Sequence, residues 1–115
     1  AVRDSFLAFL AKAKAQGKTV AAYGAAAKGA TFLNYAGVTA ADIVAAFDAN
    51  PHKQGRFLPG AHVPIYAPAE IAQIRPDYVV ILPWNLKDEI MGQLAYIKDW
   101  GGQFVIASPD TRVVG

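Results

Sequence analysis

The sequence predicts an α/β fold, a three-layer sandwich with a mainly parallel sheet. Short apolar runs alternate along the chain with helical patterns, as they do when strands are buried between two layers of helices. The apolar fraction of 54% and the charged fraction of 17% fit a sheet that is covered on both faces. The length of 115 residues is that of a single domain.

The first helix and the first strand are predicted at the start of the chain. Apolar residues recur at helical spacing over residues 2–16, and Gly17 ends the pattern. Residues 18–23 form a short apolar run bounded by glycines, which favours a buried strand. Residues 24–29 are the turn after this strand.

A second helix, strand and loop follow. Residues 31–36 are predicted to form a short helix, which Gly37 closes at the C′ position. Residues 43–47 are a second buried strand that ends in Asp48. Residues 50–60 are a polar loop with two glycines and two prolines.

The middle of the chain is predicted to hold a weak strand, a helix and a strong strand. Residues 63–66 are at best a short edge strand, because Pro64 cannot donate to a ladder. Residues 68–74 are predicted to be helical, since Pro68 suits the first turn of a helix. Residues 78–82 are the strongest strand in the sequence.

The last helix and the last strand lie near the end of the chain. Asn85 is expected to cap the helix, with Asp88 as the acid of a capping box. The apolar face of this helix is expected to consist of Leu86, Ile90, Leu94 and Ile97. The centre of the sheet is expected to be parallel, with right-handed crossovers that put the loops after the strands on one edge. Its strands are residues 19–23, 43–48, 78–82 and 103–107.

A glycine motif follows the first predicted strand. Gly24-x-Ala26-x-x-Gly29 has the spacing of the dinucleotide fingerprint, with Ala26 in place of the second glycine. In such a motif Gly24 makes the tight turn, Gly29 lets helix and strand pack closely, and helix N–H groups face an anion. The motif would make the sandwich Rossmann-like. A plain glycine-bounded turn explains the same residues equally well.

A positively charged loop follows the second predicted strand. Residues 51–60 hold His52, Lys53 and Arg56 and no acidic residue. The loop is expected on the same edge of the sheet as Lys28, where cations beside a helix N-terminus could seat phosphate oxygens. A solvated surface loop is the alternative.

Two other strand ends carry candidate residues. Asp48 lies 24 residues after Gly24, near the position where Rossmann proteins hold ribose hydroxyls, although a solvated acid at the sheet edge is the simpler interpretation. Trp84 could stack on a base or sugar, or cover the core. Asn85 is a helix cap more readily than a ligand contact.

Composition excludes several functions. The chain has no cysteine, which rules out disulfides and thiolate chemistry, and its two histidines lack the spacing of a zinc site. No metal ligand is therefore assigned, and no catalytic residue either, because the serines have no nearby base and no paired carboxylates stand at a cleft-like position. A net charge of +2 is too small to indicate nucleic acid. Because no run approaches the roughly 18 apolar residues of a membrane span and no signal peptide is present, we expect a cytoplasmic protein without a membrane partner.

Three long motifs resemble the C-terminal domain of the bacterial nucleotide-sugar C-methyltransferases. They are residues 23–29 with Leu33-Asn34-Tyr35, residues 51–60, and residues 75–89. The resemblance covers nearly the whole chain. Ala30 departs from it, because the family is expected to favour asparagine there.

The resemblance implies a C-terminal fragment of a longer enzyme that depends on S-adenosylmethionine. The parent would bind zinc in an N-terminal segment and S-adenosylmethionine in a central domain that supplies the proton-abstracting base, and this domain would hold no cofactor. Its substrate would be a nucleotide-diphosphate keto sugar, often a deoxysugar. This domain would close the cleft against the methyltransferase domain of the same chain and lack activity by itself. The implied substrate-binding residues are Tyr23, Gly24, Ala25, Ala26, Lys28, Gly29, Asn34, His52, Lys53, Arg56, Trp84 and Asn85.

Two other functions are compatible with the residues alone. The glycine turn and Asp48 would suit a free-standing module that binds NAD or CoA. A Rossmann-like domain without any ligand would serve as an interdomain scaffold.

Overall fold

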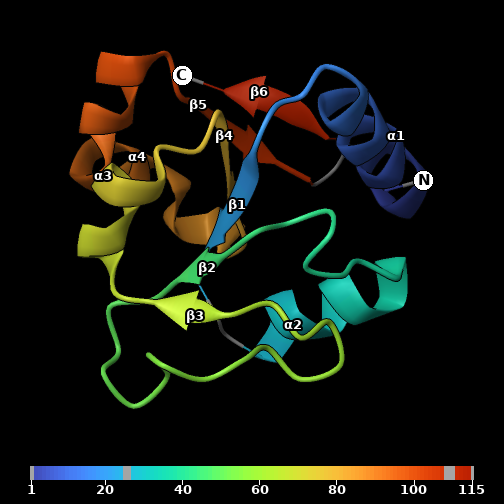
Figure 1. Cartoon of the computed structure of the whole chain (residues 1–115), viewed down its shortest axis with the longest axis horizontal. Helices are drawn as coiled ribbons and strands as arrows, with labels where there is room; N and C mark the ends of the chain where they lie inside the picture. Colours follow the sequence, from blue (N-terminus) through green and yellow to red (C-terminus); the bar gives the residue numbers. More distant parts are fainter. Residues whose placement is uncertain (1, 25–26, 108–110, 115) are drawn as a thin grey trace.

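The chain forms a six-stranded sheet with helices on both faces (Figure 1). The computed structural model describes residues 2–24, 27–107 and 111–114, and the side chains of Val2, Ala27 and Lys28 lie outside what it describes. The helices are α1 (Val2–Ala15), α2 (Ala27–Ala36), α3 (Ile71–Ile74) and α4 (Lys87–Gln93), with 3-10 turns η1 (Pro68–Glu70), η2 (Trp84–Leu86) and η3 (Ala95–Trp100). The strands are β1 (Val20–Tyr23), β2 (Ala46–Phe47), β3 (Ile65–Tyr66), β4 (Tyr78–Ile81), β5 (Gln103–Ile106) and β6 (Arg112–Val114).

The strands lie in the order β3-β2-β1-β4-β5-β6. Each neighbouring pair from β3 to β5 is parallel, so the predicted parallel centre is confirmed. From β1 the chain adds β2 and β3 on one side of the sheet, then crosses to β4 on the other side. This reversal of strand order at β1 and β4 is the topological switch point of a Rossmann-like sheet.

Two apolar cores lie on opposite faces of the sheet. Helices α1 and α2 cover one face, and α3 and α4 cover the other (Figure 1). Successive residues of β4 alternate between the two, since Val80 belongs to the first core and Val79 to the second. Both valines are fully buried, which explains why the strand is apolar along its whole length.

Backbone hydrogen bonds bear out two of the predicted boundaries. The N–H of Gly37 donates to Asn34 O and the N–H of Val38 donates to Leu33 O, so α2 ends in a Schellman motif at the predicted glycine. The short strand β3 was expected as an edge strand, and it ends the sheet. Outside β3, Gly55 N–H donates to Ile65 O, so the loop after β2 folds back along its free edge.

Several predicted boundaries differ from the structure. Strand β2 is limited to Ala46–Phe47. Val44 N–H still donates to Val20 O and Ala45 O accepts from Ala22 N–H, whereas Ile43 N–H turns back to Thr39 O. Helix α2 begins at Ala27, four residues before the predicted start, and takes in part of the glycine turn.

The predicted cap of the last helix is wrong. Helix α4 begins at Lys87, after the 3-10 turn η2, and no side chain caps either element. Asp88 pairs with Lys87 at 2.9 Å instead of reaching back to Asn85. The 3-10 turn also rotates Leu86 off the apolar face, and this side chain is 45% exposed.

The sequence interpretation ended the sheet one strand too early. Strand β6 pairs with β5 in the antiparallel direction, with Val113 opposite Val105. The segment before β6 is tied to α1, because Thr111 N–H donates to Ser5 Oγ at 3.2 Å. Within the described ranges, no helix combines the length and the hydropathy that a bilayer crossing requires.

Candidate functional site

The switch point is built around Gly24, the first residue after β1. Its φ of +93° is one that only glycine adopts readily, and its N–H donates to Phe47 O at 2.7 Å. A Cβ atom at this position would lie 2.7 Å from Pro83 Cδ. The turns that follow β1 and β4 are therefore in direct contact. Ligands of open α/β sheets bind outside the carboxyl ends of the strands at such a point.

Gly29 brings the first turn of α2 onto the end of β4. A Cβ atom here would lie 2.9 Å from both Cβ and Cδ1 of Leu82. Close packing of helix and strand is the role that the glycine motif predicted for this residue. Ala25 and Ala26, which complete the motif, lie outside the described residues, as does the Lys28 side chain.

Trp84 presents an aromatic surface next to this turn. Its ring is 6.3 Å from that of Phe32 in an edge-to-face arrangement, and Phe32 in turn lies 5.2 Å from the buried Phe6. Trp84 is nevertheless 39% exposed. The core thus supports one side of the indole while another side stays open for stacking. The neighbouring Asn85 is exposed in η2.

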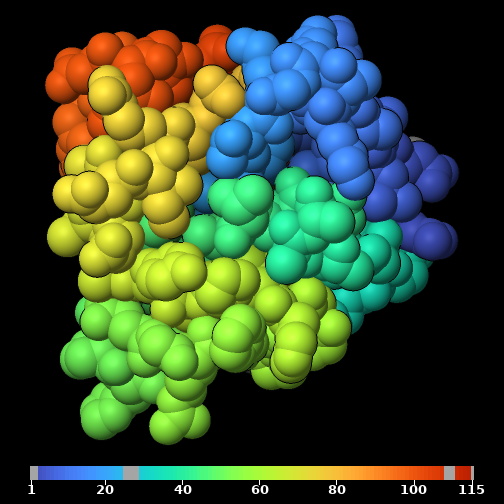
Figure 2. Space-filling view, in the orientation of Figure 1, coloured from blue at the N-terminus to red at the C-terminus, as the bar shows by residue number. Residues whose placement is uncertain are grey.

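The positively charged loop, residues 51–60, lies near β2 and β3, whereas Trp84 follows β4. His52 N–H donates to Asn50 Oδ1, and Lys53 N–H donates to Asn50 O, so this part forms a compact turn after β2. Arg56 is exposed, and its carbonyl accepts from Ile65 N–H beside β3. Figure 2 shows the green atoms of the loop gathered at the bottom of the molecule.

The strand order sets how far this loop stands from Trp84. Strands β2 and β1 lie between β3 and β4, which corresponds to about 14 Å at the usual strand spacing. Trp84 and the glycine turn therefore lie at one end of this edge, and Lys53 and Arg56 lie at the other end. The groups that were expected to converge share the edge but do not meet at one point. The two groups flank the ends of β1 and β2, and an elongated ligand would be needed to touch both.

Asn34 contacts the loop instead of the switch point. It lies in α2, and its side-chain Cγ would be 2.6 Å from a Cβ atom placed on Gly60. Gly60 has a φ of +79° at the end of the loop. The amide of Asn34 thus packs where a side chain at position 60 would have to stand, and it holds the loop end against α2.

Tyr23 is the last residue of β1 and packs against the core on the face of the sheet that α3 and α4 cover. Burial raises the pKa of its hydroxyl above 10.0, and the charge of Asp48 and the neighbouring Tyr96 raise it further. Burial also raises the pKa of Tyr96. Tyr96 was not among the predicted site residues. It precedes Ile97 of the predicted apolar face, and that position alone does not indicate a site residue. In the structure it lies in η3 and interacts electrostatically with Tyr23 at the end of β1.

The raised pKa makes stability depend on pH in a defined direction. Because the folded state holds the Tyr23 proton more tightly than the unfolded state, its contribution is complete below pH 10 and is lost as the pH rises through the folded pKa. We expect Tyr23 to ionise above free tyrosine in a ¹³C NMR titration, with Tyr23→Phe assigning the signal. Asp48→Asn should lower the midpoint, whereas Asp42→Asn should leave it in place. Ionisation of Tyr23 at or below the value of free tyrosine would contradict this assignment.

The described part of the chain offers binding groups of three kinds. They are an aromatic surface at Trp84, a close-packed turn at Gly24, and cations in the loop after β2. Over the same ranges, no three side chains of His, Cys, Asp or Glu gather as ligands for a metal ion. The arrangement suits recognition of an elongated, anionic ligand.

Comparisons with known proteins agree with this architecture. The family model of the C-methyltransferase C-terminal domain matches residues 1–109. The C-methyltransferase NovU of Streptomyces niveus is 39% identical to the chain over 100 residues. This alignment covers 87% of the chain and 24% of NovU, so the chain spans about a quarter of the length of that relative.

Proposed function

The chain belongs to the C-methyltransferase C-terminal domain family, and from that premise we propose that it holds the substrate of a larger enzyme. The substrate is a nucleotide-diphosphate keto sugar, and the methyl donor is S-adenosylmethionine. The observation that carries the proposal is the switch point, where Gly24 packs on Pro83 and Trp84 stands exposed beside them. A crevice at this place in an open α/β sheet is the usual seat of a nucleotide.

The elongated shape of the candidate site supports a sugar nucleotide over a small metabolite. A nucleotide-diphosphate sugar carries two phosphates between two ring systems, so it needs an aromatic surface and an anion site some distance apart. Trp84 offers the first and the loop with Arg56 offers the second, on either side of the ends of β1 and β2. Arginine is well suited to phosphate because its guanidinium can form two charge-assisted hydrogen bonds.

The catalytic steps belong to other parts of the proposed enzyme. We assign S-adenosylmethionine and the base that removes a proton from the sugar carbon to the methyltransferase domain, and zinc to a further segment. The role of this domain is to bind and orient the sugar nucleotide and to close the cleft against that partner domain. Orientation alone can lower a barrier considerably when the reacting atoms are held in near-attack geometry.

Titration of the full-length enzyme with its nucleotide-diphosphate sugar tests the proposal. Arg56→Ala should weaken binding about tenfold, because a charge-assisted hydrogen bond is lost. Trp84→Ala should weaken it by a similar factor of up to about ten through the loss of stacking. Lys98→Ala removes an exposed charge from η3 and should leave the affinity unchanged.

Two results would overturn the assignment. If both variants stay folded and bind the sugar nucleotide as tightly as the original protein, the domain is an interdomain scaffold. If NAD or CoA binds in place of the sugar nucleotide, the glycine turn binds a cofactor and not the proposed substrate.

A further inference from the structure

A separate pocket lies between α1 and the sheet, toward the amino ends of the parallel strands. Its volume is about 200 Å³. The lining residues come from segments that are far apart in the sequence: Phe9, Lys12 and Ala13 of α1, Gln16 in the turn after it, Tyr78 of β4 and Val113 of β6. Tyr78 is the first residue of β4, whereas the candidate substrate site follows its last residue. Val113 pairs with Val105 further along the sheet, so the pocket extends from the amino end of β4 along the face that α1 covers.

The inner wall of the pocket is aromatic. The rings of Phe9 and Tyr78 are 5.0 Å apart with an interplanar angle of 75°, so each is fixed by the other. Both side chains are half-buried, and Val113 supplies an aliphatic wall that is 44% exposed. An apolar cavity of about 150 Å³ can hold benzene, so this pocket has room for one six-membered ring with a small substituent.

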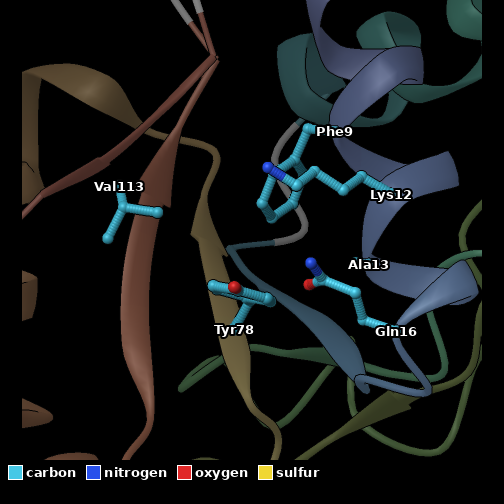
Figure 3. Close-up of a pocket in the computed structure, with 6 residues that line it drawn as sticks. All are labelled: Phe9, Lys12, Ala13, Gln16, Tyr78 and Val113. Carbon is cyan, nitrogen blue, oxygen red and sulfur yellow. The ribbon is translucent and has the colours of Figure 1, made fainter.

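The rim of the pocket is polar and positively charged. Figure 3 shows the amine of Lys12, from α1, and the amide of Gln16, from the turn after α1, both extending toward the strands. A second amine stands close by, since Lys18 Nζ lies 5.7 Å from the centre of the Tyr78 ring. None of the six lining residues is acidic. A ligand that fits this wall and this rim has a flat apolar body and one negative charge.

We propose that this pocket binds a small aromatic carboxylate. The ring of the ligand lies against Phe9 and Tyr78, and its carboxylate meets the Lys12 ammonium and the Gln16 amide. The proposal is independent of the sugar nucleotide, because none of the six lining residues belongs to the candidate substrate site. It depends instead on β6, which contributes the lining residue Val113 and is preceded by Thr111, a residue hydrogen-bonded to α1.

Titration of the ¹⁵N-labelled protein with sodium benzoate tests this site. We expect NMR shifts centred on the amides of Lys12, Gln16 and Val113, and weaker binding of the neutral isostere benzamide. Lys12→Ala should raise the dissociation constant of benzoate about fivefold, the scale of a partly exposed ion pair. Lys14→Ala is the matched control, because Lys14 lies on the same helix outside the pocket.

A second variant keeps the test decisive if Lys12→Ala perturbs the fold. Val113→Phe places a ring in the mouth of the pocket at an exposed position, and it should abolish the benzoate shifts while the rest of the spectrum is retained. The proposal is overturned if benzoate causes no localised shifts, if benzamide binds equally well, or if inorganic phosphate produces the same shifts. Unchanged benzoate binding in a folded Val113→Phe variant would also overturn it.

Discussion

Replacing Gly24 with alanine is expected to lower the free energy of unfolding by about 2–5 kcal/mol. Two costs add at this position. The backbone has a φ of +93°, which disfavours any residue with a Cβ atom, and that atom would lie 2.7 Å from the rigid ring of Pro83. The loss is a large part of the roughly 5–15 kcal/mol that stabilises a domain of this size. Urea unfolding followed by tryptophan fluorescence measures it.

Gly37→Ala separates the two costs. Gly37 also has a positive φ, of +75°, but nothing lies within 4 Å of the position that its Cβ atom would take. Only the backbone cost remains there, so the expected loss is about 1–2 kcal/mol. Equal losses in the two variants would mean that the contact between Gly24 and Pro83 contributes nothing, and the close approach of the two turns would then be irrelevant to stability.

Gly29→Ala is expected to destabilise the protein by about 1–3 kcal/mol, although alanine favours helices. The new methyl group would meet Cβ and Cδ1 of Leu82 at 2.9 Å, so the first turn of α2 must move away from the end of β4. Because Leu82 is 7% exposed and packed in the core, it has little room to give. For a domain of this size the melting temperature should fall by about 4–8 °C for each kcal/mol.

The matched control for this variant is Gly92→Ala. Gly92 is also helical, in α4, and its Cβ position has no neighbour within 4 Å. Here alanine should stabilise the protein by about 0.4–1 kcal/mol, because it restricts the unfolded chain without any clash. The two substitutions are chemically identical and should shift the melting temperature in opposite directions. A stabilising Gly29→Ala would show that α2 and β4 are not in close contact.

Both glycine variants also bear on the candidate site. Gly24 and Gly29 set how near α2 and the β4 turn come to each other, and Trp84 follows directly on that turn. A shift of α2 would carry Phe32 with it and remove the support that its ring gives to Trp84. If the domain holds a sugar nucleotide as proposed, affinity for it should therefore fall in Gly29→Ala even under conditions where the variant stays folded.

The layered fold and its central strands follow from the order of the residues alone. Runs such as residues 78–82 are apolar at every position, and such a strand is stable only where both faces of the sheet are covered. The glycine spacing also indicated a tight turn at Gly24 and close packing of helix and strand at Gly29, because a residue without a Cβ atom allows both. The helix end at Gly37 could be predicted for a similar local reason.

Other features depend on contacts between elements that are distant in the sequence. Strand β6 has three residues and no period of its own, and it exists because the edge of β5 pairs with it. The 3-10 turn after β4 moved Leu86 into solvent and left Asn85 without a capping role. The close approach of Asn34 to Gly60, the electrostatic interaction of Tyr23 with Asp48 and Tyr96, and the ring contact of Phe9 with Tyr78 join residues from different elements. Sequence periodicity reports only which face of one element is apolar, so contacts between elements, and the sites that they build, appear only once the sheet has assembled.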